Sequence, residues 1–315
     1  MMQEIIAYLK GSNAEKVKLF FVIRNKDQRT REINYYLLKS MISKEVGAEL
    51  KNNAISQSMA ISEKGLASIN YGNLLSSDRD YIEIIKADDV PYMLSLITAT
   101  ADTELGIIDD SDFNNVWGYI TRIEDINPNR CLLLFKKSTA SKLLKKGKMA
   151  VTFRSGQFDK MDAQVITLEY NYDAALLIKE SKDADKNVII LNRYSFEALF
   201  SFIDYYQKEV ENKIKDIAEK DLFDNVDTLL RLCITDPKKI KKLAKILKGE
   251  FFDSIDVIKI KESITPYGLK IKLNKDNKIK IGDSNIWDIL RILDDDCVNS
   301  EITGSKYLAH SKLKV

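Results

Sequence analysis

Lysines that alternate with apolar residues are the chemically most distinctive feature of this sequence. The stretch GLKIKLNKDNKIKIG, residues 268–282, places lysine beside leucine or isoleucine on both sides of a short turn. Alternation with a period of two predicts two β-strands, each with one apolar and one polar face. The apolar faces meet if Leu273 pairs with Ile279, and a three-residue loop at 275–277 provides that register, with Asn277 suited to the left-handed conformation.

The same register sets Lys272 directly opposite Lys280. Like charges opposite each other on a sheet are unfavourable by about 0.2–1 kcal/mol per pair. The lysines of this face are Lys270, Lys272, Lys278 and Lys280. We therefore predict that the face binds a polyanion, with the phosphates of double-stranded DNA as the ligand. The alternative is a solvated face, from which long lysine chains extend into water.

Two further lysine runs favour phosphate contact without base reading, because lysine is a point charge. DPKKIKKLAKILKGE, residues 236–250, predicts a helix with Asp236 as N-cap, Pro237 at the first position and Gly249 past the end. Its expected exposed lysines are Lys238, Lys239, Lys241, Lys242, Lys245 and Lys248. Of these, Lys238, Lys241, Lys242 and Lys245 would extend the hairpin's DNA track if folding brings the two elements together. The other run comprises Lys136, Lys137, Lys142, Lys145, Lys146 and Lys148.

A metal-dependent nuclease is the competing interpretation. Such a site needs an Asp and a (D/E)-x-K motif on adjacent strands, with the carboxylates holding Mg²⁺. Glu180-Ser181-Lys182, with Asp173 or Asp162 upstream, has this composition. The motif also occurs at several other places, as chance predicts in a chain with 30% charged residues.

Other catalytic signatures are weak. The run 294–296 consists of three aspartates after an expected helix and, with Glu301, could bind a cation, although a solvated turn is the commoner structure. The single histidine, His310, has no nucleophile pattern around it, and no GxxxxGK[ST] or GxGxxG loop follows a strand. We expect no catalytic residues, no bound metal and no cofactor.

Composition sets the frame for these sites. The 315 residues are 45% hydrophobic and include only four prolines and twelve glycines, which predicts a folded chain with a substantial core. Residues 1–135 carry 15 Lys+Arg and 19 Asp+Glu, whereas residues 136–315 carry 34 and 28. The second part is therefore more basic, which favours an anionic partner there. Three separate cysteines predict free thiols in a reducing cytoplasm.

No stretch has the length of a membrane span, and the first eleven residues do not resemble a signal peptide. We expect a cytoplasmic protein that reaches a membrane only through a partner.

The elements that must position these residues follow from the hydrophobic pattern. The first part predicts helices over 3–10, 32–50 and 90–101, with strands at 17–25 and 81–87. Short strands with tight turns follow at 116–124, 131–137, 149–155, 163–170, 174–180 and 187–192. Such spacing excludes crossover helices and predicts an antiparallel sheet or small barrel.

The last part is expected to be mainly helical. Helices are predicted over 194–220, 225–234 and 285–293, besides the lysine-rich one, and the chain should close on a strand. The predicted fold is α+β, with a mixed N-terminal part, a central antiparallel sheet or small barrel, and a helix-rich basic C-terminal part. We place the domains at 1–125, an α/β part, and 126–315, a β-rich and then helical part.

Four segments resemble the KwaB family, the soluble components of the Kiwa anti-phage defence system. They are VKLFFVIRNKDQRTREINYYLLKS, RCLLLFKK, NRYSFEALFSFIDYY and ILDDDCVNSEITGSKYLAHSKLKV. The resemblance extends over essentially the whole chain and rests on overall pattern rather than on catalytic motifs. It implies a homodimer that works with the membrane protein KwaA at the inner membrane, binds phage DNA, and interferes with its replication and transcription. It supplies no catalytic residues.

Overall fold

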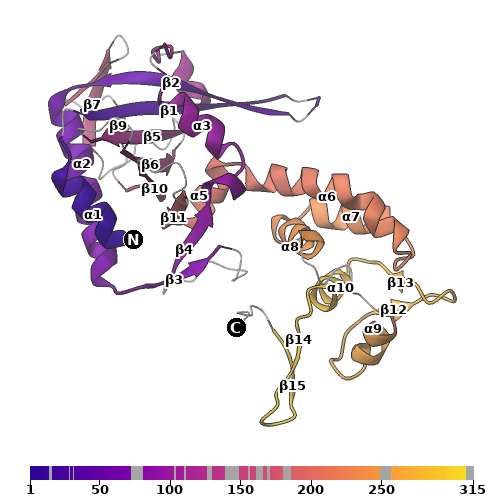
Figure 1. Ribbon diagram of the computed structural model, residues 1–315. Helices are drawn as coiled ribbons and strands as arrows, with labels where there is room; N and C mark the ends of the chain where they lie inside the picture. Colours follow the sequence, from indigo (N-terminus) through magenta and orange to yellow (C-terminus); the bar gives the residue numbers. More distant parts are fainter. Residues whose placement is uncertain are drawn as a thin grey trace. The chain divides into compact units, whose positions relative to one another are not determined.

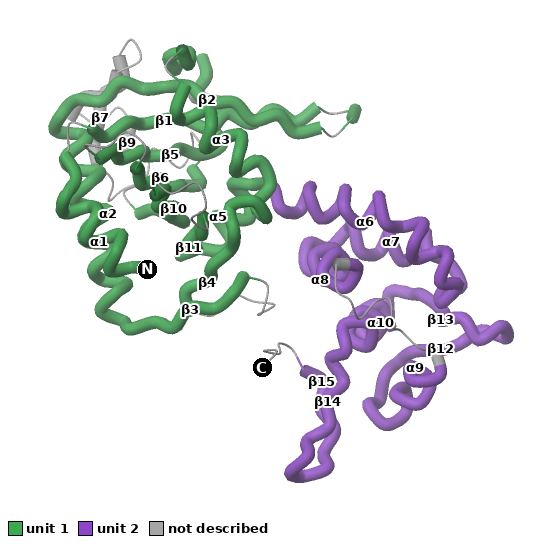
Figure 2. The backbone as a smooth tube through the Cα atoms, viewed as in Figure 1, with its two compact units in different colours: residues 1–71, 77–200 green, residues 72–76, 201–315 purple. Residues whose placement is uncertain are grey.

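The computed structural model of the protein has two compact units (Figures 1 and 2). Unit 1 is Met1–Tyr71 with Ser77–Phe200, and unit 2 is Gly72–Ser76 with Ser201–Val315. The structure describes residues 1–13, 16–27, 29–30, 32–71, 81–102, 104–109, 111–125, 130–138, 149–154, 157–160, 166–168, 171–179, 186–248 and 257–309. The boundary predicted near residue 125 lies between two neighbouring strands of unit 1, whereas this grouping separates the chain at residues 200 and 201.

Unit 1 is built on one large open sheet. Its strands are β1 (Val17–Lys26), β2 (Ile33–Ile42), β3 (Ala67–Asn70), β4 (Tyr81–Lys86), β5 (Val116–Glu124), β6 (Cys131–Lys137), β7 (Met149–Arg154), β8 (Gln157–Lys160), β9 (Ile166–Leu168), β10 (Ala174–Ile178) and β11 (Asn187–Ile190). Their order is β3-β4-β11-β10-β6-β5-β1-β2-β8-β7-β9. Only β3–β4 and β2–β8 pair in parallel among these strands. The antiparallel sheet is confirmed, and the small-barrel alternative is wrong because β3 and β9 stand at opposite ends of the order.

Helices cover both faces of this sheet. The helices of unit 1 are α1 (Met2–Gly11), α2 (Lys44–Glu63), α3 (Met93–Ala99) and α5 (Arg193–Leu199), with short 3₁₀ turns η2 (Ala87–Asp89) and η3 (Asp112–Asn115). One apolar cluster joins α1 and α2 to alternate residues of β1, including Leu19 and Phe21. On the opposite face, Phe200 after α5 packs 5.5 Å, centroid to centroid, from Phe135 of β6. Strand β1 is therefore buried on both sides, which explains its nearly continuous apolar sequence.

The helix expected over 32–50 is wrong for its first half. Residues 33–42 form β2, which pairs with β1 from Leu19↔Ser40 to Lys26↔Ile33. The buried residues Ile33, Leu37 and Ser40 recur at intervals of four and three, as they would on a helix, but pairing with a distant strand outweighs that local pattern. The helical half begins at Ser43, whose side chain accepts a hydrogen bond from the Val46 backbone N–H.

Unit 2 gathers helices around a second apolar core. Its elements are α6 (Phe202–Glu219), α7 (Val226–Ile234), α8 (Pro237–Lys248), α9 (Val257–Ile264), α10 (Ile286–Leu293), and the strands β12 (Lys272–Leu273), β13 (Ile279–Lys280), β14 (Cys297–Asn299) and β15 (Lys306–Leu308). The helix predicted over 194–220 is two helices, α5 and α6, because Ser201 adopts a left-handed backbone with φ 48°. The other predicted helices of this part are present, and the overall α+β class is confirmed.

Candidate nucleic-acid interface

The lysine hairpin has the predicted register. Lys272 pairs with Lys280, and Leu273 pairs with Ile279. Asn277 adopts φ 65°, the left-handed conformation expected of it. The Asn274 side chain accepts hydrogen bonds from the backbone N–H groups of residues 276 and 278, which closes the turn. Strands β12 and β13 are only two residues each, so few strand-to-strand hydrogen bonds set the positions of Lys272 and Lys280. The hydrogen-bonded turn at Asn274 therefore sets the pairing of the two lysines.

The hairpin is anchored by its apolar face. Ile271 and Ile279 are buried in the core of unit 2. The Ile279 N–H donates to the Leu222 carbonyl, and the Asp224 N–H donates to the Ile279 carbonyl, so residues 222–224 run alongside β13. Because side chains alternate along a strand, burying the isoleucines directs the lysines to the opposite face.

On that face the four lysines are not equivalent. Lys270, Lys272 and Lys280 are exposed, and none of them forms an ion pair with the residues that the structure describes. Lys278 lies 2.5 Å from Asp221, an acid of the loop after α6. The hydrogen bond that Lys278 donates to the Asp221 carboxylate raises the pKa of Lys278 above its ordinary value. The charge available to a ligand therefore lies on Lys270, Lys272 and Lys280, of which Lys272 and Lys280 are directly opposite each other.

Helix α8 begins as predicted, because Asp236 accepts a hydrogen bond from the Lys238 backbone N–H at 2.8 Å. The predicted exposure of Lys242, however, is wrong. Its side chain is 1% exposed, and its Nζ donates to Asp294 and Asp296, both at 2.6 Å. The ammonium joins α8 to the end of α10 and cannot meet DNA.

The remaining lysines of α8 do not form a continuous row with the hairpin. Lys238 is exposed, Lys241 is partly buried, and Lys245 lies 3.6 Å from Asp294. In Figure 1, α8 and the β12–β13 hairpin are separated, with α10 drawn between them. Unit 2 as a whole carries 22 Lys+Arg and 20 Asp+Glu, so its positive charge is local. The hairpin face is therefore the stronger candidate.

Two aspartates of the run 294–296 bind the ammonium group of a lysine side chain, Lys242. Asp296 is buried, Asp294 is 11% exposed at its side chain, and both bind Lys242. Lysine thus occupies the place that the sequence suggested for a bound cation. In the part of the chain that the structure describes, no group of three His, Cys, Asp or Glu residues could hold a metal ion.

Of the candidate nuclease residues, only Asp173 is among the residues that the structure describes. Asp173 is buried, and its carboxylate accepts hydrogen bonds from the Lys136 side chain at 3.2 Å and the Lys137 backbone at 2.8 Å. This carboxylate therefore ties β6 to the start of β10. Asp162, Glu180, Ser181, Lys182 and His310 lie outside the described residues, as do Lys142, Lys145, Lys146 and Lys148.

Sequence reasoning missed a cationic cluster around Trp117 in unit 1. Lys137 Nζ lies 3.4 Å and Arg24 Cζ 4.4 Å from the centroid of its ring. These residues come from three adjacent strands, so only strand pairing brings them together. A tryptophan near the start of the strand was the available signal in the sequence.

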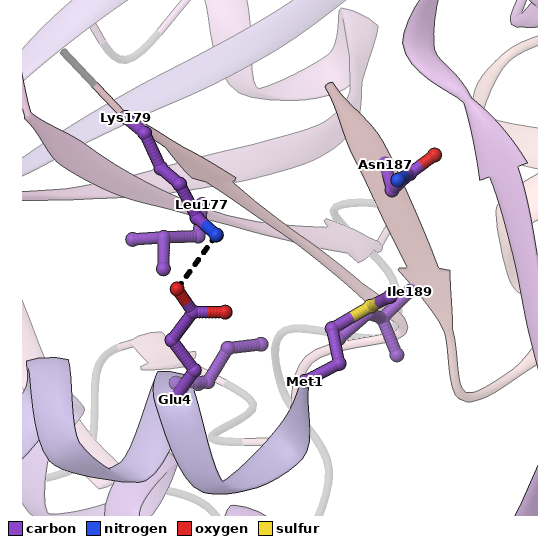
Figure 3. A pocket seen from close by; sticks show the side chains of 7 residues that line it. Met1, Glu4, Leu177, Lys179, Asn187 and Ile189 are labelled. Carbon is purple, nitrogen blue, oxygen red and sulfur yellow. Dashed lines mark ion pairs between the residues drawn. The ribbon is translucent and has the colours of Figure 1, made fainter. Parts of the chain in front are cut away.

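A small open pocket has a volume of about 200 Å³. Figure 3 shows its lining side chains, which come from α1 and from the region of strands β10 and β11. Its polar lining includes Glu4 and Lys179, which form an ion pair at 2.7 Å. Both side chains are more than 40% exposed, so water screens them strongly. The pocket offers little specific chemistry.

No helix in the described residues is long and apolar enough to cross a membrane. Residues 113–303 match the family model described as "Kiwa protein KwaB-like". The match covers more than half of the 315 residues and includes the hairpin, α8 and the aspartate run. No curated protein and no solved structure matches the chain significantly.

Proposed function

The chain belongs to the KwaB-like family, which suggests a role in Kiwa anti-phage defence, and we propose that it acts there by binding double-stranded DNA. The contact is made without sequence specificity by the lysines of the β12–β13 hairpin. One observation carries this proposal: Lys272 and Lys280 are exposed and directly opposite each other, beside a turn closed by the hydrogen bonds of Asn274.

Physical chemistry supports a phosphate ligand at this face. The two ammonium groups repel each other in the free protein, and a phosphate between them relieves the repulsion. Each contact also releases counterions from DNA, which favours binding at low salt. Lysine carries no geometry for reading base edges, so affinity should be similar for unrelated sequences.

Equilibrium binding to unrelated duplexes tests the proposal. Lys272→Glu/Lys280→Glu should weaken binding by a similar factor for every duplex. The control is Lys208→Glu/Lys215→Glu, which makes the same charge change at two exposed positions of α6 in the same unit. An equal loss in both variants would mean that net charge, and not the hairpin, governs binding. Unchanged affinity in the hairpin variant would remove the proposed site.

A single substitution separates folding from binding. Lys272→Glu replaces the opposed lysines by an opposite-charge pair, which should stabilise the hairpin by about 0.2–1 kcal/mol. The same change should weaken DNA binding. A variant that is more stable and binds DNA less well cannot be explained by misfolding.

The proposal extends to the partners that the family resemblance implies. Bound DNA is blocked from replication and transcription, two copies of the chain form a homodimer, and the membrane protein KwaA recruits the otherwise cytoplasmic protein to the inner membrane. Light scattering of the purified protein tests the dimer. Sedimentation with membranes that contain or lack KwaA tests recruitment; binding to anionic liposomes alone, in physiological salt, would contradict it.

We also propose that the protein acts without catalysis, and that the nuclease alternative does not apply. DNA should remain intact when it is incubated with the protein and Mg²⁺ or Mn²⁺. Metal-dependent degradation that is lost in Glu180→Ala or Asp295→Ala would establish the nuclease instead.

A further inference from the structure

Strands β1 and β2 extend beyond their neighbours as a two-stranded arm. Strand β5 pairs with β1 only as far as Ile23, whereas β1 and β2 continue to pair up to Lys26 and Ile33. Figure 1 shows this ribbon projecting from the sheet of unit 1. We define the arm as the described residues 24–27, 29–30 and 32–34.

The tip of the arm has a definite shape. The Asp27 carboxylate accepts hydrogen bonds from the backbone N–H groups of Arg29 and Thr30, each at 2.7 Å. The bond from Thr30, followed by that from Arg29, lowers the pKa of Asp27, so the carboxylate stays ionised and keeps the turn closed. The Asp27 N–H also donates to the Glu32 carbonyl at 2.9 Å. Arg29 is exposed in this turn, at the end of the ribbon.

A row of cations leads from the sheet to this tip. Lys137 and Arg24 both contact the ring of Trp117, whose Nε1–H donates to the Ala198 carbonyl at 3.0 Å and fixes the ring. Lys26 is exposed and shares the face of Arg24, two residues along β1. By sequence, residues 24–32 carry four basic and two acidic side chains. By sequence, residues 24–32 therefore carry a net charge of +2.

We propose that this arm lies in the major groove of double-stranded DNA, where Lys26 and Arg29 contact the flanking phosphates. A two-stranded ribbon fits a major groove, which is about 8.5 Å deep. Residues 24–27 span about 10–13 Å at the rise of an antiparallel strand, so the arm is long enough to fill it. Arginine and lysine side chains suit contact with phosphates. At the start of the arm, Arg24 and Lys137 also stack on the Trp117 ring. The inference rests on the proposed DNA binding and adds a second contact, in unit 1.

Two duplexes of one sequence, with the major groove open or filled, test this placement. In one duplex the cytosines are unmodified; in the other they carry glucosylated hydroxymethyl groups, which project into the major groove and leave the phosphates in place. The variant is Lys26→Glu/Arg29→Glu. Its control is Lys10→Glu/Lys64→Glu, with the same charge change at exposed positions of unit 1 away from the arm.

The wild type and the control should bind the glucosylated duplex more weakly than the unmodified one. The arm variant should bind both duplexes equally, and its salt slope on the unmodified duplex should be smaller by about two. If the wild type binds DNA but the arm variant behaves like the control, the arm is not a contact. The arm variant could instead lose affinity by the same factor on both duplexes and still prefer the unmodified one as the wild type does. In that case Lys26 and Arg29 contact phosphates outside the groove, and the placement is wrong. If the wild type binds neither duplex, the proposed function itself fails.

Discussion

The buried ammonium of Lys242 should dominate the stability of unit 2. Replacing it by methionine keeps the length of the side chain but removes the ammonium that both carboxylates bind, and Asp294 keeps only the longer contact of 3.6 Å to Lys245. Asp296 is only 2% exposed at its side chain and Asp294 11%, so water cannot replace the ammonium at either group. Removing one partner of a buried ion pair typically costs about 3–5 kcal/mol. Because Lys242 makes two contacts of 2.6 Å to carboxylates that are almost fully buried, we expect the loss of unfolding free energy in Lys242→Met to lie within this range.

Urea unfolding followed by the fluorescence of Trp287 measures this loss. Trp287 packs against the core of unit 2, and Trp117→Phe removes the other indole, so the signal reports unit 2 alone. Lys245→Met is the matched control: its side chain is 40% exposed and 3.6 Å from Asp294, and its loss should cost at most about 1 kcal/mol.

A rescue variant separates lost packing from buried charge. Lys242→Met/Asp296→Asn removes the more deeply buried of the two carboxylates that bind Lys242 and should recover much of the stability lost in Lys242→Met. The reasoning is refuted if Lys242→Met costs no more than Lys245→Met, or if the second substitution makes the loss larger.

Two further predictions concern the packing of each unit. A Cβ at Gly118 would lie 2.5 Å from both the Leu199 side chain and the Lys136 carbonyl oxygen, so Gly118→Ala should destabilise unit 1 by about 1–3 kcal/mol, measured by thermal unfolding; an unchanged melting temperature would contradict this. Burial raises the pKa of Cys233 to about 12 and also raises that of Cys131, so neither thiol should be alkylated by iodoacetamide at pH 8 until the protein unfolds. Rapid alkylation of Cys233 in the folded protein would mean that α7 is not packed as described.

The lysine hairpin could be predicted in register because its information is local. Alternation defines the two faces, and Asn277 fits the only residue of the turn that needs a positive φ. The start of α8 was predictable for the same reason, since a capping aspartate and a proline at the first position act within one turn.

The errors concern partners that are distant in the sequence. The local pattern predicts that Lys242 lies on the solvent face, because lysine is rarely buried, yet the two carboxylates that bind it are more than 50 positions away. Residues 33–42 were assigned to a helix because nothing local reveals that β1 pairs with them. The cluster on Trp117 likewise depends on the order of strands, which the hydrophobic pattern does not specify.

The salt dependence of DNA binding tests the central claim most directly. The logarithm of the association constant should fall linearly with the logarithm of salt concentration, with a slope of about −0.9 per phosphate contacted. Lys272→Gln/Lys280→Gln should make this slope smaller by about two, while Lys208→Gln/Lys215→Gln should leave it unchanged. If the hairpin variant keeps the slope of the wild type, Lys272 and Lys280 do not face phosphates, and the hairpin is a solvated surface.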